Sequence, residues 1–279
     1  MIVHNFTFSK KNTMNTIKTT TDENRKAKLE AFDRLLTVMD ELRENCPWDK
    51  KQTLESLRYL TIEETYELSD AILENDLNEV KKELGDLMLH MVFYARIASE
   101  TKAFDIADVM NGICEKLIHR HPHIYGDTEV KDENEVKENW EKLKLKEKGN
   151  KTVLGGVPKS LPAMVKAMRI QEKARGIGFD WDNKDQVWEK VQEELGEFKE
   201  EIEKGDMQKS KSEFGDLLFS MVNYSRFVDI DPEEALERTN KKFIKRFNYL
   251  ESESKKAGKN ISDMTLSEME EYWEKAKLI

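Results

Sequence analysis

The chain has 279 residues, a formal net charge of −10, and charged side chains at 37% of its positions. With only 12 glycines and 5 prolines, it favours long helices over a strand-rich sandwich or barrel, because these residues form the turns between strands. No stretch without charged residues exceeds nine residues, far below the about 20 apolar residues that span a bilayer, so the sequence excludes a membrane-spanning segment.

The acidic balance and the cysteines narrow the class of protein further. The phosphate backbones of nucleic acids attract basic surfaces, so a net charge of −10 argues against nucleic acid as a partner. Cys46 and Cys114 lie in unrelated contexts and form no CxxC pair, which is typical of reduced thiols. The N-terminus has no apolar core of signal-peptide length. These features predict a soluble, cytoplasmic protein.

Apolar periodicity predicts helices through the N-terminal half of the chain. Residues 1–25 have no apolar period and predict a disordered tail, so a first domain is expected at 26–148. From Lys28 onward, apolar residues recur at three- and four-residue steps, which is typical of an amphipathic helix. Further helices are expected at about 53–74, 76–100, 105–120 and 132–148.

A turn-rich segment divides the chain. Residues 149–162 contain three of the 12 glycines and two of the five prolines, which predicts a linker before a second domain at 163–279. Within that domain, Asp231 before Pro232 marks the start of one helix, and Thr265 marks the start of the last. Helices are expected at about 163–175, 185–204, 206–228 and 232–256.

The two predicted domains repeat one helical pattern. ELGDLMLHMVFYAR at 83–96 and EFGDLLFSMVNYSR at 213–226 agree at eight of fourteen positions, with an offset of 130. EETYEL at 63–68 and EELGEF at 193–198 correspond at the same offset. Two tandem copies of one all-α unit are the economical interpretation.

Each copy carries the same spacing of acidic residues, Glu-Glu-x-x-Glu followed sixteen residues later by Glu-x-x-Asp. Residues three apart share a helix face. A turn is expected at Asn75. Glu67 and Glu83 lie eight residues from it on either side, and Glu64 and Asp86 lie eleven residues from it. The carboxylates of the second copy have the same distances in sequence from Gly205. In an antiparallel hairpin, residues equidistant from the turn lie at the same height, so four carboxylates are expected to form a square about 12 Å from each turn. The squares comprise Glu64, Glu67, Glu83 and Asp86 in the first copy, and Glu194, Glu197, Glu213 and Asp216 in the second.

Four carboxylates this close together require a counter-ion. Two of them about 5 Å apart repel by about 3 kcal/mol at an effective dielectric near 20. Oxygen ligands without His or Cys suit Mg²⁺, or Mn²⁺ as the alternative, rather than Zn²⁺. The solvated faces of an acidic helix pair are the simpler explanation of one such pattern, but its occurrence about two independent turns favours a metal site.

The doubled acidic pattern, with CPWD, HRHPHIYGD and FDW around it, resembles the MazG family of nucleoside triphosphate pyrophosphohydrolases from about residue 28 to residue 279. The resemblance implies an all-α fold that forms a homodimer. It also implies Mg²⁺-dependent hydrolysis of nucleoside and deoxynucleoside triphosphates to the monophosphate and pyrophosphate.

The resemblance implies roles for individual residues of the second copy. The metal ligands would be Glu194, Glu197, Glu213 and Asp216, and substrate contacts map to Lys190, Glu193, Lys209, Lys211, Lys242, Arg246 and Trp273. The chemistry of these side chains is consistent with the roles that the resemblance implies. Lys242 and Arg246 are one helical turn apart, with Asn240 nearby, and such a face can neutralise triphosphate oxygens. Trp273 can stack a base. An exposed helix face and a core tryptophan are the simpler explanations of these residues.

The first copy matches this set in part. Lys116 and Arg120 align with the cationic pair of the second copy, and all four carboxylates are present. In MazG-like proteins the C-terminal copy is generally the stronger candidate for catalysis, and the activity of the first copy is left open. For His119, His121 and His123, which flank an arginine and a proline, a structural or substrate-neighbouring role is favoured over a second metal site.

The predicted mechanism is metal-assisted phosphoanhydride hydrolysis. Glu194 and Glu197 act in catalysis by holding the metal, and Glu193 is free to orient or deprotonate the attacking water. A di-iron carboxylate bundle is a rival class of protein, and it requires the motif Glu-x-x-His. In this chain the residue at the position of that histidine is Asp86 in the first copy and Asp216 in the second. A non-catalytic helical nucleotide-binding or scaffold protein with vestigial acidic clusters is the other alternative.

Overall fold

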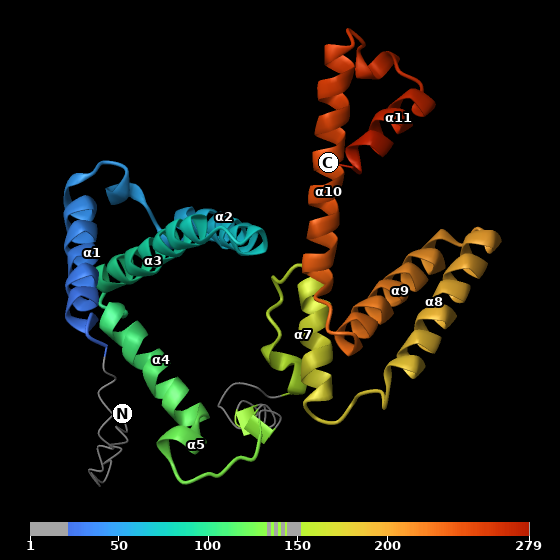
Figure 1. Ribbon diagram of the computed structural model, residues 1–279. Coiled ribbons are helices and arrows are strands. Elements are labelled where there is room, and N and C mark those ends of the chain that lie inside the picture. The colour runs from blue at the N-terminus through green and yellow to red at the C-terminus, as the bar shows by residue number, and fades with distance from the viewer. Residues whose placement is uncertain (1–21, 133–134, 137–138, 141–142, 144–151, 279) are drawn as a thin grey trace. The chain divides into compact units, whose positions relative to one another are not determined.

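The computed structural model (Figure 1) describes residues 22–132, 135–136, 139–140, 143 and 152–278. These residues form helices joined by turns, with no β-strand among them, so the predicted all-α class is confirmed. None of the helices in this part of the chain is long and apolar enough to cross a membrane. The chain divides between residues 133 and 134 into two compact units.

The first unit is organised around an antiparallel hairpin of two long helices. Its elements are α1 (Arg25–Asn45), the 3-10 turn η1 (Asp49–Lys51), α2 (Leu54–Glu74), α3 (Leu77–Glu100), α4 (Ile106–Arg120) and α5 (Pro122–Tyr125). Helices α2 and α3 form the hairpin, α1 packs on α3, and α4 continues from the end of α3 (Figure 1).

The second unit repeats this order. Its elements are the 3-10 turn η2 (Val153–Gly156), α7 (Ala163–Arg175), α8 (Lys184–Lys204), α9 (Met207–Phe227), α10 (Pro232–Lys256), the 3-10 turn η3 (Ile261–Asp263) and α11 (Leu266–Ala276). Helices α8 and α9 form the hairpin, α7 packs on α9, and α11 folds back on α10 (Figure 1). The packing of α7 on α9 corresponds to that of α1 on α3, as expected for two copies of one unit.

Both hairpins turn through the same pair of caps. Asn75 and Gly205 adopt the left-handed conformation that ends α2 and α8, with φ values of 56° and 74°. Asp76 and Asp206 then begin α3 and α9, and each side chain accepts hydrogen bonds from two backbone N–H groups of the first turn. The turns predicted at Asn75 and Gly205 are confirmed, and they fix which residues of the paired helices face each other.

The predicted helix bounds in the described residues agree with the structure to within one residue, with two differences. Helix α1 begins at Arg25, because Asp22 already accepts the backbone N–H groups of Asn24 and Arg25 and turns the chain. Helix α5 begins at Pro122, where the sequence predicted only a break; a proline fits the first turn of a helix, since its missing N–H would have no partner there. Residues 1–21 and most of the predicted helix at 132–148 lie outside the described residues.

Each unit buries a small core beside its hairpin. The fully buried cluster of the first unit joins α1, α2 and α3 and consists of Met39, Leu57, Val92 and Phe93. The buried apolar residues of the second hairpin are smaller: Val187, Val191 and Val222. Apolar residues beside the acidic positions remain exposed on α3 and α9, namely Leu84, Met88, Phe214 and Leu218. The described part of a single chain therefore leaves an apolar hairpin face uncovered.

The left-handed turn makes a stability prediction at Gly205. A Cβ there would meet no atom within 4 Å, so an alanine changes only the backbone energy. We expect Gly205→Ala to lower the free energy of unfolding by roughly 1–2 kcal/mol, because an L-residue with a side chain disfavours positive φ. Urea denaturation followed by circular dichroism measures this change.

Gly196→Ala is the matched control within the same hairpin. Gly196 lies inside α8, where a Cβ also meets nothing within 4 Å. Alanine should raise the free energy of unfolding there by roughly 0.5–1 kcal/mol, because it lowers the entropy of the unfolded chain. Shifts in the same direction for both variants would contradict the role given to the left-handed turn.

Candidate metal centre and active site

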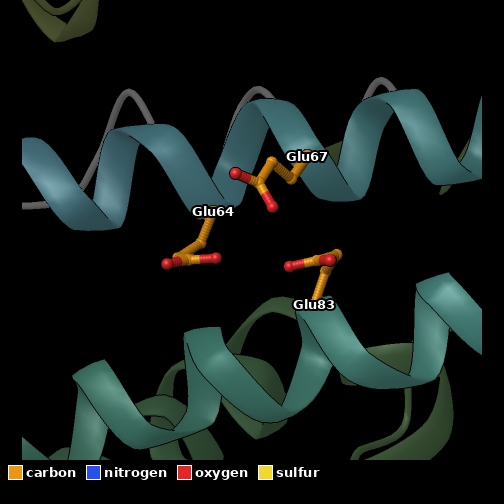
Figure 2. A group of neighbouring side chains, drawn as sticks. All are labelled: Glu64, Glu67 and Glu83. Atoms are coloured by element: carbon orange, nitrogen blue, oxygen red, sulfur yellow. The ribbon is translucent and has the colours of Figure 1, made fainter.

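Three glutamates of the first unit converge between α2 and α3. Figure 2 shows Glu64 and Glu67 on α2 and Glu83 on α3, all pointing into the space between the two helices. One carboxylate oxygen of each lies within 4.8 Å of the others. Glu83 is 2% exposed; its Oε1 accepts a hydrogen bond from Lys82 Nζ at 2.8 Å, and its buried Oε2 has no hydrogen-bond partner among the described residues. A bound cation would satisfy this oxygen, which is costly to leave unpaired.

The fourth predicted ligand of the first copy, Asp86, acts on the same group through its charge. Burial raises the pKa of Glu64, and the like charge of Asp86 is the next cause. Glu67 and Glu83 raise this pKa in the same way. A raised carboxyl pKa means that the negative charge is disfavoured until a cation is present. In the first copy, three of the four carboxylates of the predicted square lie together, and Asp86 acts on Glu64 through its charge.

The second unit has an equivalent cluster between α8 and α9. Glu194 from α8 and Glu213 and Asp216 from α9 each place a carboxylate oxygen within 4.8 Å of the others. Burial is the largest cause of the raised pKa of Glu213. The negative charge of Glu197 is the next largest cause, followed by the charges of Asp216, Glu194 and Glu201. Three of the four carboxylates of the second square therefore lie together, and Glu197, like Asp86 in the first copy, acts on the group through its charge.

Each cluster includes a lysine paired with its most buried carboxylate, but the two lysines stand at different positions. Lys82 on α3 pairs with Glu83, the residue that follows it. Lys190 on α8 lies 2.6 Å from Glu194 and 2.9 Å from Glu193. Hydrogen bonds to these carboxylates raise the pKa of both lysines. The sequence analysis missed Lys82, because neighbouring residues on a helix do not normally face each other and their pairing leaves no spacing signal.

His90 is a second residue that the sequence analysis did not single out. It follows Asp86 by one turn of α3, is 6% exposed, and its Nδ1 has no hydrogen-bond partner among the described residues. Burial lowers the pKa of the imidazole, and the charge of Asp86 opposes this change. In the second copy the same position is Ser220, whose hydroxyl donates to the backbone carbonyl of Asp216 at 2.9 Å. A buried histidine in an apolar helix face carries no signal in a single sequence.

The residues expected to bind the base and the triphosphate lie on elements other than the carboxylate hairpin. Asn240, Lys242 and Arg246 belong to α10, and Trp273 belongs to α11. The Arg246 guanidinium lies 5.7 Å from the centre of the Trp273 ring, so the structure brings these two residues together. Helix α10 packs on α7 and α11, and it stands apart from the α8–α9 hairpin (Figure 1). Among the described residues, no hydrogen bond or ion pair joins these side chains to the carboxylates of the cluster.

The other predicted cations are distributed over two helices. Lys209 and Lys211 lie near the start of α9, where Lys209 Nζ is 3.9 Å from Asp206. Lys116 and Arg120 lie on α4 of the first unit. Their part in substrate binding stays a prediction.

The three histidines near the end of α4 are separate from both clusters. Nδ1 of His121 lies 2.6 Å from the Leu117 carbonyl oxygen, and its ring centre is 5.5 Å from that of His123. Over the described ranges, the groups whose geometry suits a metal ion are the two carboxylate clusters, and neither includes a histidine.

The fold and the two clusters define a class of protein: an all-α chain of two tandem units, each presenting oxygen ligands suited to a hard divalent cation. The family follows from comparison with known proteins. The model of the MazG nucleotide pyrophosphohydrolase domain matches residues 52–125 and 183–250, which contain the two carboxylate hairpins. The chain belongs to the MazG family, and it carries the domain twice.

Curated relatives match along most of the chain. The nucleoside triphosphate pyrophosphohydrolase/pyrophosphatase MazG of Thermotoga maritima is 45% identical over 250 residues, which are 88% of this chain and 95% of the relative. The nucleoside triphosphate pyrophosphohydrolase of Escherichia coli K12 is 40% identical over 254 residues, which are 88% and 97% of the two chains. A crystal structure of a MazG-related protein from Thermotoga maritima covers 41% of this chain and 99% of its own, with 27% identity and a TM-score of 0.37. The family resemblance found from the motifs is confirmed.

The charge repulsion within the second cluster predicts the effect of neutralising Glu213. The raised pKa of Glu213 means that the folded state binds more protons than the unfolded chain, so the stability of the metal-free protein falls as the pH rises through that pKa. We expect Glu213→Gln to raise the Tm of the metal-free protein at pH 7, and to flatten the fall of Tm with pH. Calorimetry in the presence of a chelator measures both changes.

Metal binding should reverse the order of the Tm values of the wild type and the Glu213→Gln variant. Added Mg²⁺ should raise the Tm of the wild type, and this shift should shrink in the Glu213→Gln variant, which keeps only the first cluster intact. Glu203→Gln is the control, since Glu203 is an exposed residue of α8 outside the cluster, and it should keep the wild-type response. A Glu213→Gln protein with lowered metal-free Tm and an undiminished Mg²⁺ shift would contradict the assignment.

Proposed function

We propose that the chain hydrolyses nucleoside and deoxynucleoside triphosphates to the monophosphate and pyrophosphate, with Mg²⁺ as the cofactor and Mn²⁺ as an alternative. The observation that carries the proposal is the cluster between α8 and α9, where the carboxylates of a MazG domain converge. Relatives that match 88% of the chain are named as nucleoside triphosphate pyrophosphohydrolases, which supports the same activity here.

The carboxylates divide into metal ligands and a base. The residues that would hold the cation are Glu194, Glu197, Glu213 and Asp216. When bound, Mg²⁺ would offset the negative charge of the phosphate oxygens during phosphoanhydride cleavage. Glu193 is not one of the clustered carboxylates and its side chain is 56% exposed, so it would be available to orient a water molecule and accept its proton. Lys190 bridges Glu193 and Glu194, so it positions the base beside a metal ligand.

Basic and aromatic side chains outside the carboxylate cluster would bind the rest of the substrate. Lys242 and Arg246 lie one turn apart on α10, with Asn240 close by, and together they can neutralise triphosphate oxygens. Lys209 and Lys211 on α9 would contribute in the second copy, and Lys116 and Arg120 in the first. Trp273 is proposed to stack on the substrate.

We propose a cytoplasmic homodimer in which a second copy brings these residues to the carboxylates. The α8–α9 hairpin and α10 both present exposed apolar side chains, including Leu195 at 46%, Phe214 at 47% and Phe243 at 57% exposure. Continuous apolar surfaces of this kind mark interfaces. Helix hairpins that pair through such faces form four-helix bundles, with the metal ligands between facing helices.

Interface variants test the homodimer. We expect the wild type to elute at the mass of two chains in size-exclusion chromatography with light scattering, at micromolar concentration. Phe214→Glu should shift the protein toward the mass of one chain, because a charge in an apolar interface is left unpaired. Leu266→Glu is the control, at an exposed residue in the first turn of α11, and should not change the mass. A monomeric wild type would contradict the proposal.

The first copy is proposed to bind metal, since it retains the four carboxylates and a buried oxygen without a partner in Glu83. A non-catalytic role is the second candidate for this copy. Lys82, rather than a lysine equivalent to Lys190, pairs with its buried carboxylate. Among the described residues, no lysine pairs with Glu63 as Lys190 pairs with Glu193.

Pyrophosphate release from a panel of nucleoside and deoxynucleoside triphosphates tests the proposed activity. Glu197→Gln should lower kcat by about 100-fold or more, because it removes a metal ligand from the second copy. Glu67→Gln is the matched control at the corresponding position of the first copy, and it should keep kcat within about twofold if catalysis belongs to the second copy.

Two results would contradict this account. Equal partial losses in the two single variants, with full loss in the double variant, would mean two working sites. A folded wild type that releases no pyrophosphate from any substrate in the panel would overturn the hydrolase and favour a nucleotide-binding scaffold.

A further inference from the structure

Two side chains of α3 in the first unit hold buried polar atoms without partners. Glu83 is 2% exposed, and its Oε2 has no hydrogen-bond partner among the described residues. His90 is 6% exposed, and its Nδ1 lacks a partner in the same part of the chain. Buried polar atoms are almost always satisfied in native proteins. Each of these two atoms is therefore available to bind a ligand.

Helix geometry places His90 on the face of α3 that is directed at α2. His90 follows Glu83 by seven residues and precedes Tyr94 by four, which is about two turns and one turn of the helix. Glu83 points into the space between α2 and α3 (Figure 2). The hydroxyl of Tyr94 also reaches α2, where it lies 2.6 Å from the hydroxyl of Thr61. Because His90 lies between these two contacts and is buried, its side chain belongs to the same space.

His90 is also a neighbour of Asp86, the fourth carboxylate of the first square. The two residues are four apart, so they lie on one face of α3. The Cα–Cβ bonds of a helix tilt toward its N-terminus, which directs the His90 side chain back toward Asp86 and the cluster. Burial lowers the pKa of the imidazole and the charge of Asp86 opposes this change, as expected for two groups this close. Ligands four residues apart on a helix can bind one metal ion, as the two histidines of H-E-x-x-H bind zinc.

Asp86 and His90 both lie outside the group of three glutamate oxygens that are within 4.8 Å of one another. They are on adjacent turns of α3 and are directed at the same space. Rotation about their side-chain bonds can therefore bring both to a cation that is held by Glu83 and Glu64. Such a cation would have carboxylate oxygens and one imidazole nitrogen as its ligands.

The second copy has a serine where the first has His90. The hydroxyl of Ser220 donates to the backbone carbonyl of Asp216 at 2.9 Å, so it is already engaged within its own helix. The carboxylate of Asp216 belongs to the group of three in the second copy, whereas that of Asp86 does not belong to the group in the first. The second cluster thus presents carboxylate oxygens, and the first adds an imidazole beside them.

We propose that His90 is a metal ligand of the first cluster, and that it makes this cluster select a late first-row transition metal such as Zn²⁺ or Co²⁺ over Mg²⁺. The inference rests on the part of the proposed function that gives the first copy a metal site, and it adds the class of metal. Imidazole nitrogen suits zinc and its neighbours, whereas Mg²⁺ prefers oxygen ligands. The second cluster remains a site for Mg²⁺, so one chain holds two kinds of metal ion.

Calorimetric titration of the full-length chain with Zn²⁺ and with Mg²⁺ tests the selectivity. The Glu213→Gln background disables the second cluster, so the first is measured alone. In that background His90→Ser should weaken Zn²⁺ binding by about 100-fold and change Mg²⁺ binding by less than about twofold. His119→Ser is the matched control, because His119 is an exposed residue of α4, and it should leave both affinities unchanged. Thermal unfolding shows whether each variant is folded.

Co²⁺ identifies the ligand directly. A histidine bound to Co²⁺ gives a strongly shifted proton NMR signal from its ring N–H, and this signal disappears in D₂O. We expect one such signal from the Co²⁺-loaded Glu213→Gln protein and its loss when His90→Ser is added. The Glu83→Gln protein, which keeps only the second cluster intact, should give no such signal. This measurement requires neither substrate nor turnover.

His90→Gln separates metal ligation from a hydrogen-bonding role, because glutamine keeps a polar group of similar size. We expect it to lose Zn²⁺ affinity and the NMR signal as His90→Ser does. Wild-type Zn²⁺ affinity in either folded variant would overturn the inference, as would a Co²⁺-loaded first cluster without the exchangeable signal. A Glu213→Gln protein that binds neither Zn²⁺ nor Co²⁺ would overturn it together with the metal site of the first copy. Failure of the second copy to release pyrophosphate would leave these results unchanged and overturn only the proposed hydrolysis.

Discussion

Repulsion between carboxylates held at one level of a helix hairpin is the constraint on which the rest of the structure depends. The left-handed turns at Asn75 and Gly205 fix the register of the paired helices, and this register brings the acidic side chains of both within 4.8 Å. Burial raises the pKa of Glu64 and Glu213, so the clusters are least favourable in the metal-free protein at neutral pH. In the proposed function, the same arrangement would bind a divalent cation and, through it, a triphosphate, which would offset this cost.

Much of this arrangement was predictable from the sequence, because it depends on spacing. The distance in residues from Asn75 or Gly205 to each carboxylate determines its height in the hairpin, and cap residues mark the turns without any knowledge of packing. Features that depend on tertiary contacts were not predictable. The pairing of Lys82 with Glu83, the burial of His90 and the cavity beside Asn223 arise from how the helices pack, and none leaves a periodic signal.

The two copies have kept the carboxylates and changed what surrounds them. The buried carboxylate is on α3 in the first copy and on α8 in the second, and the lysine that neutralises it has moved with it. At the position of Asn223, which lines a cavity in the second copy, the first copy has the buried core residue Phe93. These differences give a physical basis for unequal roles, because the two copies share the acidic pattern and differ in the partner of the buried carboxylate and in the core residues beside it.

Counting bound metal ions tests the central claim most directly. Mn²⁺ binding, followed by electron paramagnetic resonance, should show one cluster site in each unit of the wild-type chain. Glu213→Gln should abolish the site of the second unit, Glu83→Gln that of the first, and the double variant should bind no Mn²⁺ tightly. A folded double variant with the same Mn²⁺ stoichiometry as the wild type would contradict the account, because the carboxylate clusters would then not be the metal sites.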